Sequence, residues 1–132
     1  MPQKVMFKHC DPAGIVFYPR YFEMMNDCVE VFFDEVLGCS FEKLHEFGGV
    51  PTAEMSIQFK AASRHGDHLK ISLSCVKIGR SSVGLETLAH CGDELRFAAK
   101  STLVFVNLHG KPTAWPDDVR PKLEQQMKES TR

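Results

Sequence analysis

Residues 9–22 read His-Cys-Asp-Pro-Ala-Gly-Ile-Val-Phe-Tyr-Pro-Arg-Tyr-Phe, so an acid and a glycine lead directly into a long apolar segment. Pro12 biases the preceding Asp11 away from helical geometry, and Gly14 permits a sharp turn because it lacks a Cβ. Pro19 suits the first turn of a helix, where its missing N–H costs no hydrogen bond. The stretch therefore predicts a turn that holds the Asp11 carboxylate near the free N–H groups of a helix start, which attract negative charge. From spacing alone, an acid that only caps a turn is the preferred interpretation.

The apolar segment is predicted to be one helix, from about Pro19 to Leu37, ended by Gly38 as a C-cap. Its apolar residues recur at helical spacing: Tyr21, Met25, Cys28, Val29, Phe32 and Val36, widened by Phe22, Met24, Val31 and Phe33. So wide a stripe exceeds that of an ordinary surface helix and requires another element to wrap it. We interpret these Met and Phe residues as core rather than as cofactor contacts.

The rest of the chain is predicted to form mainly strands, because its apolar residues alternate with a period of two from Pro51 onward. We expect an extended run at 5–7, a short second helix at 40–47 capped by Ser40, strands around 55–59, 69–75, 82–89 and 95–107, and a polar helix with a frayed tail at 116–132. Turns at 65–67 and 92–93 would join the strands into an antiparallel meander. A wide apolar helix followed by a meander predicts an α+β fold with a sheet wrapped around the helix.

Length and composition restrict the class of protein. The 132 residues fit one domain, 1–132. A net charge of −1, from 16 Lys and Arg against 17 Asp and Glu, predicts no nucleic-acid partner, which would require a clustered basic surface. The five cysteines are scattered without a C-x-x-C pair, which predicts no zinc site and a reducing cytoplasm. No apolar stretch approaches the roughly 18 residues of a membrane span.

The run Asp-Pro-Ala-Gly-Ile-Val-Phe-Tyr-Pro-x-Tyr, residues 11–21, closely resembles the signature of 4-hydroxybenzoyl-CoA thioesterase and its hotdog-fold relatives. The match is contiguous, and the order of the following elements extends it over residues 3–110, with the C-terminal stretch left out. The resemblance implies a hotdog fold, in which an antiparallel β-sheet wraps around one long central α-helix. It also implies hydrolysis of acyl- or aryl-CoA thioesters with no cofactor, since coenzyme A is part of the substrate.

By this resemblance, Asp11 either attacks the thioester carbonyl directly, giving an anhydride that water opens, or acts as general base for water. The sequence leaves both open. A backbone N–H near Tyr18 would polarise the carbonyl, a donor typically worth about 10²–10³ in rate. Gly14 is expected beside the substrate. Tyr18 itself resembles the aryl-CoA branch, since some acyl-CoA relatives carry histidine there, although an ordinary core tyrosine is the competing interpretation.

Other residues near Asp11 are interpreted structurally. His9 would share a side with Asp11 if the strand continued, so a dyad is possible, but a histidine lining the strand end is preferred. Cys10 would face away from Asp11 on a strand and counts as packing. His65 and His68 have a spacing that could ligate metal, but a Gly-Asp turn places them at the surface, and we expect no metal site.

The family places its nucleotide contacts in a turn that falls here between the second and third predicted strands of the meander. The candidates are Lys77, Gly79, Arg80, Ser81 and Ser82. They supply cations, hydroxyls and a flexible backbone for the phosphates of coenzyme A. The family has more basic residues there than this chain, so a solvated turn is an equal alternative. Arg64 and His65 are a weaker candidate.

Two other functions share such a fold. Enoyl-CoA hydratases pair an acid with a histidine five residues later, where this chain has Val16, and the departure argues against hydration. A non-catalytic acyl-CoA-binding protein is the second alternative. The exposed sheet edge predicts a homodimer, and family members often form dimers of dimers. Acyl carrier protein could replace coenzyme A, but the near-neutral charge offers no basic surface for that acidic partner.

Overall fold

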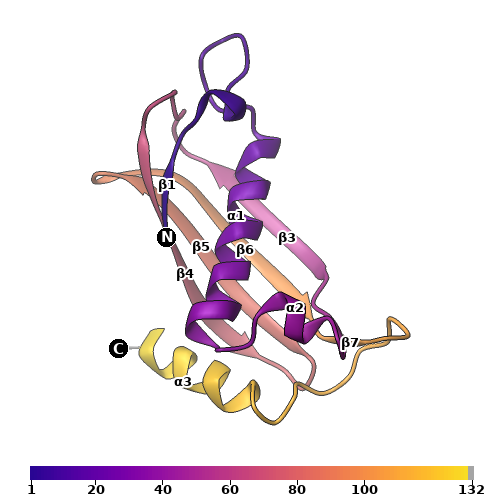
Figure 1. Ribbon diagram of the computed structural model, residues 1–132. Coiled ribbons are helices and arrows are strands. Elements are labelled where there is room, and N and C mark those ends of the chain that lie inside the picture. Colours follow the sequence, from indigo (N-terminus) through magenta and orange to yellow (C-terminus); the bar gives the residue numbers. More distant parts are fainter. Residues whose placement is uncertain (131–132) are drawn as a thin grey trace.

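One helix and one antiparallel sheet dominate the computed structural model, which describes residues 1–130 (Figure 1). In chain order the elements are β1 (Pro2–Lys4), a 3₁₀ turn (Phe7–His9), α1 (Pro19–Val31), a π-helical segment (Phe32–Val36), α2 (Phe41–Leu44), β2 (Gly48–Gly49), β3 (Thr52–Phe59), β4 (His68–Ile78), β5 (Ser82–Cys91), β6 (Glu94–Val104), β7 (Val106–Asn107) and α3 (Arg120–Ser130). The predicted strands around 69–75, 82–89 and 95–107 are confirmed as β4, β5 and β6, the last followed by β7.

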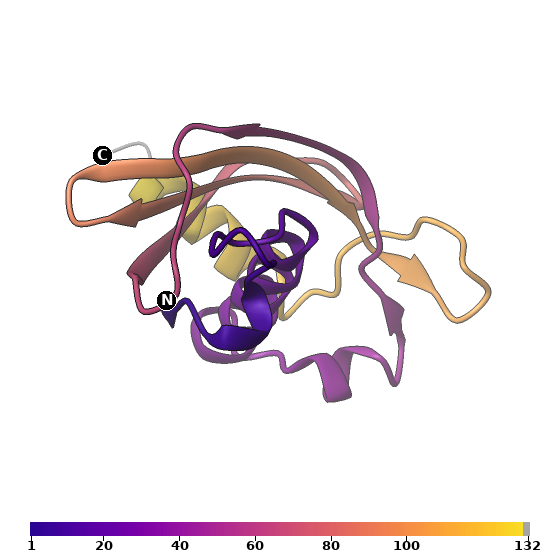
Figure 2. The same cartoon turned by 90° about the horizontal axis from the view of Figure 1, so that it is seen from above.

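Five strands pair in the order β1-β4-β5-β6-β3, and β2 pairs separately with β7. The sheet curves over α1, which lies in its concave face (Figure 2). Neighbouring strands are antiparallel throughout. The predicted α+β class and the hotdog fold are both confirmed.

Helix α1 is buried along the stripe that its sequence predicts. Its inward residues are Tyr21, Met24, Met25 and Cys28, and Phe32 and Phe33 continue the stripe into the π-helical segment. Burying one such side chain completely contributes about 1.5–3 kcal/mol. Gly38 ends the predicted helix with a φ of +64°, which a glycine adopts without strain. The predicted helix from Pro19 to Leu37 is thus confirmed, with its last turn widened to π geometry.

The N-terminal segment differs from the prediction. The strand is β1, and Phe7–His9 forms a 3₁₀ turn instead of continuing an extended run from Val5. The turn forms because the His9 N–H donates to the Met6 carbonyl at 2.9 Å, while the His9 Nδ1 accepts the Met6 N–H at 2.9 Å. The backbone N–H and the ring of His9 therefore both hydrogen-bond to Met6, and together they close the turn.

Strand β3 is also placed differently from the predicted meander. The turn at Gly66 exists, with a φ of +94°, but β3 does not pair with β4 across it. It pairs with β6 at the sheet edge, in the register Ile57 to Ala99. With only one neighbouring strand, β3 leaves Phe59 47% exposed, so the buried face expected around 55–59 is not buried within the chain.

The two shorter helices only partly match the prediction. Helix α2 is shorter than expected, and Ser40, at its N-cap, makes no side-chain capping hydrogen bond. The expected C-terminal helix is α3, and residues 131–132 of the expected frayed tail lie outside the described residues. Leu123 of α3 is fully buried beside Trp115 in one core cluster, so this helix is packed against the core despite its polar composition.

Candidate active site

The Asp11 turn sits above the N-terminus of α1, at one end of the molecule (Figure 1). The Asp11 N–H donates to the Ile15 carbonyl at 3.0 Å, and the Asp11 carbonyl accepts the Gly14 N–H at 2.9 Å. One carboxylate oxygen, Oδ1, accepts the Ala13 N–H at 2.9 Å. Gly14 has a φ of +82°, as the predicted sharp turn requires. Within residues 1–130 the other oxygen, Oδ2, has no hydrogen bond and Asp11 forms no ion pair, so part of the half-exposed carboxylate is available.

The Asp11 turn is held by the loop that joins β3 to β4. The Val16 N–H donates to the Ser63 carbonyl at 2.9 Å, and Ile15 bridges to Arg64. That loop is fastened in turn by Arg96, whose Nη1 donates to the Ala62 carbonyl at 3.0 Å and the Ser63 hydroxyl at 3.2 Å. The Asp11 position therefore depends on residues more than fifty positions away.

The loop also carries a charged contact. Asp67 Oδ2 accepts the Arg64 N–H at 2.9 Å and an Arg96 N–H at 2.8 Å. The Arg64 hydrogen bond first, and then the Arg96 guanidinium, hold the pKa of Asp67 below its usual range. Neither Asp67 nor Arg96 was a candidate site residue in the sequence, because only the folded chain brings these two positions together.

Helix α1 begins with one unused hydrogen-bond donor. Pro19 has no N–H, and the N–H groups of Arg20 and Tyr21 donate to the Phe17 and Tyr18 carbonyls. The Tyr18 N–H has no partner within the described part of the chain. No acidic residue occupies the first turn of α1, so the positive end of the helix dipole is not neutralised there. Tyr18 is 58% exposed and its ring lies edge-on to Phe59, which contradicts the alternative of a core tyrosine.

His9 is a buried structural residue rather than part of a dyad. Burial first, and then the charge of Lys8, lower the pKa of His9. A neutral imidazole that accepts a hydrogen bond at Nδ1 carries its proton on Nε2. Among the described residues no hydrogen bond joins His9 to Asp11. Cys10 packs at the border of a core cluster, as predicted.

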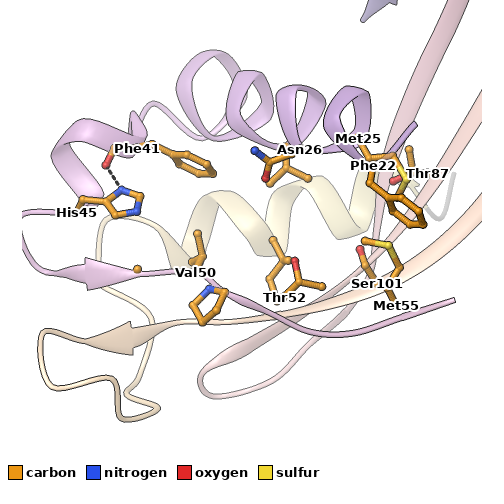
Figure 3. Close-up of a pocket in the computed structure, with 14 residues that line it drawn as sticks. Phe22, Met25, Asn26, Phe41, His45, Val50, Thr52, Met55, Thr87 and Ser101 are labelled. Atoms are coloured by element: carbon orange, nitrogen blue, oxygen red, sulfur yellow. Dashed lines mark hydrogen bonds between the residues drawn. The ribbon is translucent and has the colours of Figure 1, made fainter. Parts of the chain in front are cut away.

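A cavity of about 630 Å³ runs along α1 toward α2. Figure 3 shows Phe22 and Met25 at one end, Asn26 in the middle, and Phe41 with His45 at the other end. Phe22 lies one helical turn after Tyr18. Neither Asp11 nor Tyr18 lines the cavity, but Phe22 does.

Two buried hydroxyl groups line the same cavity from the sheet. Thr87 of β5 is 2% exposed and Ser101 of β6 is 8% exposed. Neither side chain has a hydrogen-bond partner within residues 1–130, and neither oxygen is fully occluded. The sequence does contain a signal for Thr87, since it interrupts the buried register Val83, Leu85, Ala89 of β5 with a polar group.

The predicted nucleotide turn lies at the opposite end of the sheet. Gly79, Arg80 and Ser81 join β4 to β5, and Lys77 and Ser82 flank them. The eleven residues of β4 separate this turn from the Asp11 end by about 30 Å at 3.3 Å per residue. The turn borders a cavity of about 410 Å³ that also contains Arg120, whose Nη1 donates to the Gly79 carbonyl at 2.9 Å. One chain therefore does not bring the two predicted halves of the site together.

Two features are absent from the part of the chain that the structure describes. No group of three or more His, Cys, Asp or Glu side chains there could hold a metal ion. No helix among the same residues is long and apolar enough to cross a membrane.

Comparison with known proteins places the chain among thioesterase-like proteins. The model of the thioesterase-like superfamily matches residues 5–123. A gentisyl-coenzyme A thioesterase structure shares 29% identity, covers 93% of this chain and 98% of its own, and superposes with a TM-score of 0.84. No curated protein matches.

Two further structures share the fold at lower identity. A 1,4-dihydroxy-2-naphthoyl-CoA thioesterase from Synechocystis is 18% identical, covers 93% of each chain and has a TM-score of 0.85. A Staphylococcus aureus protein solved in complex with CoA is 17% identical, covers 97% of this chain and 82% of its own, and has a TM-score of 0.91.

Proposed function

Because the chain belongs to the thioesterase-like superfamily, we propose that it hydrolyses acyl- or aryl-CoA thioesters to the free acid and coenzyme A. The observation that carries this proposal is the start of α1. There the free Tyr18 N–H follows the Asp11 turn along the chain, and Phe22, one helical turn further on, lines a cavity. The neighbour with 29% identity acts on gentisyl-coenzyme A, which makes aryl thioesters the first substrates to test.

The chemistry follows from these groups. The thioester carbonyl oxygen accepts the Tyr18 N–H, which stabilises the negative charge that develops on attack. A carboxylate oxygen of Asp11 adds to the carbonyl carbon, the C–S bond breaks, and the thiolate of coenzyme A leaves with the electron pair. Water then opens the resulting anhydride and restores the carboxylate. In the general-base alternative, Asp11 takes a proton from the water that attacks.

The substitution Asp11→Asn tests the role of the carboxylate. Asparagine keeps an oxygen for the Ala13 N–H but can neither attack nor accept a proton, so we expect kcat to fall by about 10²–10⁴-fold or more. Thermal unfolding should be close to that of the wild type, and Asp34→Asn, at an exposed helix position, is the matched control. Full activity in Asp11→Asn would exclude the proposed role.

Isotope labelling tests for direct attack. In a single turnover in H₂¹⁸O, direct attack puts label into the Asp11 carboxylate when water opens the anhydride at that carbon. General-base catalysis leaves Asp11 unlabelled and puts all the label into the product acid. Label found by mass spectrometry in the peptide that contains Asp11 therefore demonstrates the anhydride route.

The binding site for the coenzyme A nucleotide would be supplied by a second subunit. The distance of about 30 Å along β4 exceeds the length of the pantetheine arm, so the turn at Arg80 cannot hold a coenzyme A whose thioester meets Asp11 of the same chain. Antiparallel pairing of β3 with its own copy would bring the partner's opposite sheet end alongside. We therefore propose a homodimer, assembled further into a dimer of dimers. In it, the turn at Arg80 of one subunit binds the phosphates of the coenzyme A whose thioester meets the partner's Asp11.

The five unpaired cysteines fit a reducing cytoplasm, where we place the protein.

The non-catalytic alternative is tested with a panel of CoA thioesters. Tight binding of acyl-CoA with no turnover of any aryl, short-chain or long-chain thioester would favour a binding protein instead.

A further inference from the structure

Arg96 of β6 contacts the loop between β3 and β4 along most of its length. Its backbone carbonyl accepts the N–H groups at the start of the loop, from Lys60 at 2.8 Å and from Ala61 at 3.3 Å. Its side-chain Nη1 donates to three acceptors further along, the Ala62 carbonyl, the Ser63 hydroxyl and the Asp67 carboxylate. The loop and the Asp11 turn lie at the same end of the molecule (Figure 1). One residue of β6 therefore sets the path of this loop.

Ser63 connects Arg96 to the Asp11 turn. It is fully buried, and its carbonyl accepts the Val16 N–H at 2.9 Å. Within residues 1–130, the only other hydrogen bond of Ser63 is the one from Arg96 Nη1. The residue before Val16 is joined to the turn, because the Ile15 carbonyl accepts the Asp11 N–H at 3.0 Å. A displacement of Ser63 therefore shifts Val16 and the Asp11 turn with it.

The hydrogen bonds of the Arg96 guanidinium serve the loop and not its own strand. The side chain is 12% exposed. Its Nε lies 2.7 Å from the Glu94 carboxylate but makes no hydrogen bond with it, so within the described residues every side-chain hydrogen bond of Arg96 goes to the loop. Burying a charge costs free energy unless it is paired, and apolar residues of similar volume often pack as well without that cost. The three loop acceptors therefore explain the guanidinium better than packing does.

We infer that Arg96 is a positioning residue, which holds the Asp11 carboxylate in the place that attack on a thioester requires. The hold runs through Ser63 and Val16, so Arg96 itself touches no substrate. The inference rests on the proposed role of Asp11 and adds to it a residue from a distant strand. A misplacement of about 1 Å can reduce the rate of a positioned reaction by about 10²-fold, so a small movement of the loop is enough to lower kcat.

Arg96→Gln removes the guanidinium, and its shorter amide cannot reach the loop acceptors together. For the CoA thioester that the wild type hydrolyses fastest, we expect kcat to fall by about 10–100-fold. KM should change by less than about threefold, because a misplaced carboxylate weakens the transition state and not the binding of substrate. A wild-type kcat in Arg96→Gln would overturn the inference.

Arg96→Lys tests for rescue by a conservative change. All three loop acceptors bind one nitrogen, Nη1, and the ammonium group of lysine carries three donors. Arg96→Lys should therefore keep most of the wild-type kcat. If it is as slow as Arg96→Gln, donation from this nitrogen does not place the loop, and the inference is overturned.

Glu94→Gln is the matched control, because it removes the charge beside the same guanidinium without touching the loop. Its kcat should equal that of the wild type. If Arg96→Gln does not fold, Asp67→Asn decides the question. Asparagine keeps an oxygen for the Arg64 N–H but pairs less strongly with Arg96, so kcat should fall about threefold or more. An unchanged kcat in Asp67→Asn would overturn the inference.

Amide hydrogen exchange gives a readout that does not depend on activity. The Val16 N–H, which donates to Ser63, should exchange about tenfold or more faster in Arg96→Gln than in the wild type. The Trp115 N–H, which donates to the Arg80 carbonyl at the opposite end of the sheet, should exchange at the wild-type rate. Equal acceleration of both amides would show a general loss of stability and would overturn the inference.

Failure of the inference and failure of the proposed function give different results. A wild type that hydrolyses thioesters no faster than Arg96→Gln overturns the inference and leaves the function intact. If the wild type hydrolyses no thioester, hydrogen exchange decides. Faster exchange at Val16 alone supports the placement of the Asp11 turn by Arg96, and unchanged exchange at Val16 overturns it.

Discussion

At the scale of single residues, Asp11 and His9 lie two positions apart yet occupy opposite environments. The Asp11 carboxylate is half exposed, with one oxygen bonded to the Ala13 N–H and the other free of protein contacts among the described residues. The His9 ring is buried and uses Nδ1 to close the 3₁₀ turn. That turn leads directly into the Asp11 turn.

The stability of the protein should therefore fall in mild acid. The unfolded chain binds a proton at His9 below about pH 6.5, whereas burial lowers the pKa in the folded chain. The contribution of His9 to the free energy of unfolding is thus fully present above pH 6.5. It decreases as pH falls below that value, by at most about 1.4 kcal/mol per pH unit. In His9→Asn, which keeps an acceptor for the Met6 N–H, this part of the pH dependence should disappear. Urea unfolding at pH 7.5 and 5.0 measures it.

The control for this experiment is His65→Asn, at an exposed turn position, which should keep the wild-type difference between the two pH values. The Asp67 carboxylate does not interfere, because its own pKa lies below the usual range and its contribution is lost only in stronger acid. Equal slopes in the wild type and in His9→Asn would show that the His9 ring has the same pKa in the folded and unfolded chains.

At the scale of elements, the cavity exists because three segments frame it without filling it. Helix α1 forms one wall and the small side chains of β5 and β6 form the floor. The third wall is the segment after α2, which β2 fixes by pairing Gly48 with Asn107 and Gly49 with Val106 of β7. The two glycines differ in how closely the opposite strand approaches them.

This difference predicts opposite outcomes for two adjacent substitutions. A Cβ on Gly48 would lie 1.8 Å from the Val106 carbonyl oxygen, so Gly48→Ala forces the backbones apart and should destabilise the protein by about 1–3 kcal/mol. A Cβ on Gly49 meets nothing nearer than 3.9 Å, and Gly49→Ala should change stability by less than about 0.5 kcal/mol. Urea unfolding tests the pair. Comparable effects of both would contradict the close approach of β7 to Gly48.

At the scale of the whole molecule, β3 is the unfinished edge of the sheet. It has one neighbouring strand, and the rest of the chain leaves apolar side chains of β3 partly exposed to solvent. Phe59 lies against Tyr21 and beside the exposed Tyr18. Exposed edges of this kind are normally covered by another strand, which supports the proposed homodimer.

Phe59→Glu should therefore give a monomer at micromolar concentration, because a charge at the rim of the edge strand opposes its pairing with a second copy. Val76→Glu is the matched control, since Val76 is 53% exposed but lies in β4, which is separated from β3 by β5 and β6. Size-exclusion chromatography with light scattering measures the masses. The Phe59→Glu monomer should also lose thioester hydrolysis if the partner holds the nucleotide. A dimeric Phe59→Glu would place the interface elsewhere.

Local chemistry explains what was predictable from the sequence. The length of the helix, its wide apolar stripe and its end at Gly38 follow from periodicity and from the backbone freedom of glycine, which are properties of neighbouring residues. The Asp11 turn belongs to the same class, because Pro12 and Gly14 restrict and permit backbone angles directly. Strands β4, β5 and β6 were predictable because their alternating residues face one core.

Tertiary structure alone decided which strand β3 pairs with, where the His9 ring lies, and how far the turn at Arg80 is from Asp11. Strand pairing between β3 and β6 joins residues about forty to fifty positions apart, and no local pattern specifies such a partner. The same holds for Thr87 and Ser101, which share a cavity only because β5 and β6 pair in one register. Local sequence determines backbone angles, whereas the pairing of distant segments depends on the free energy of the whole packed chain.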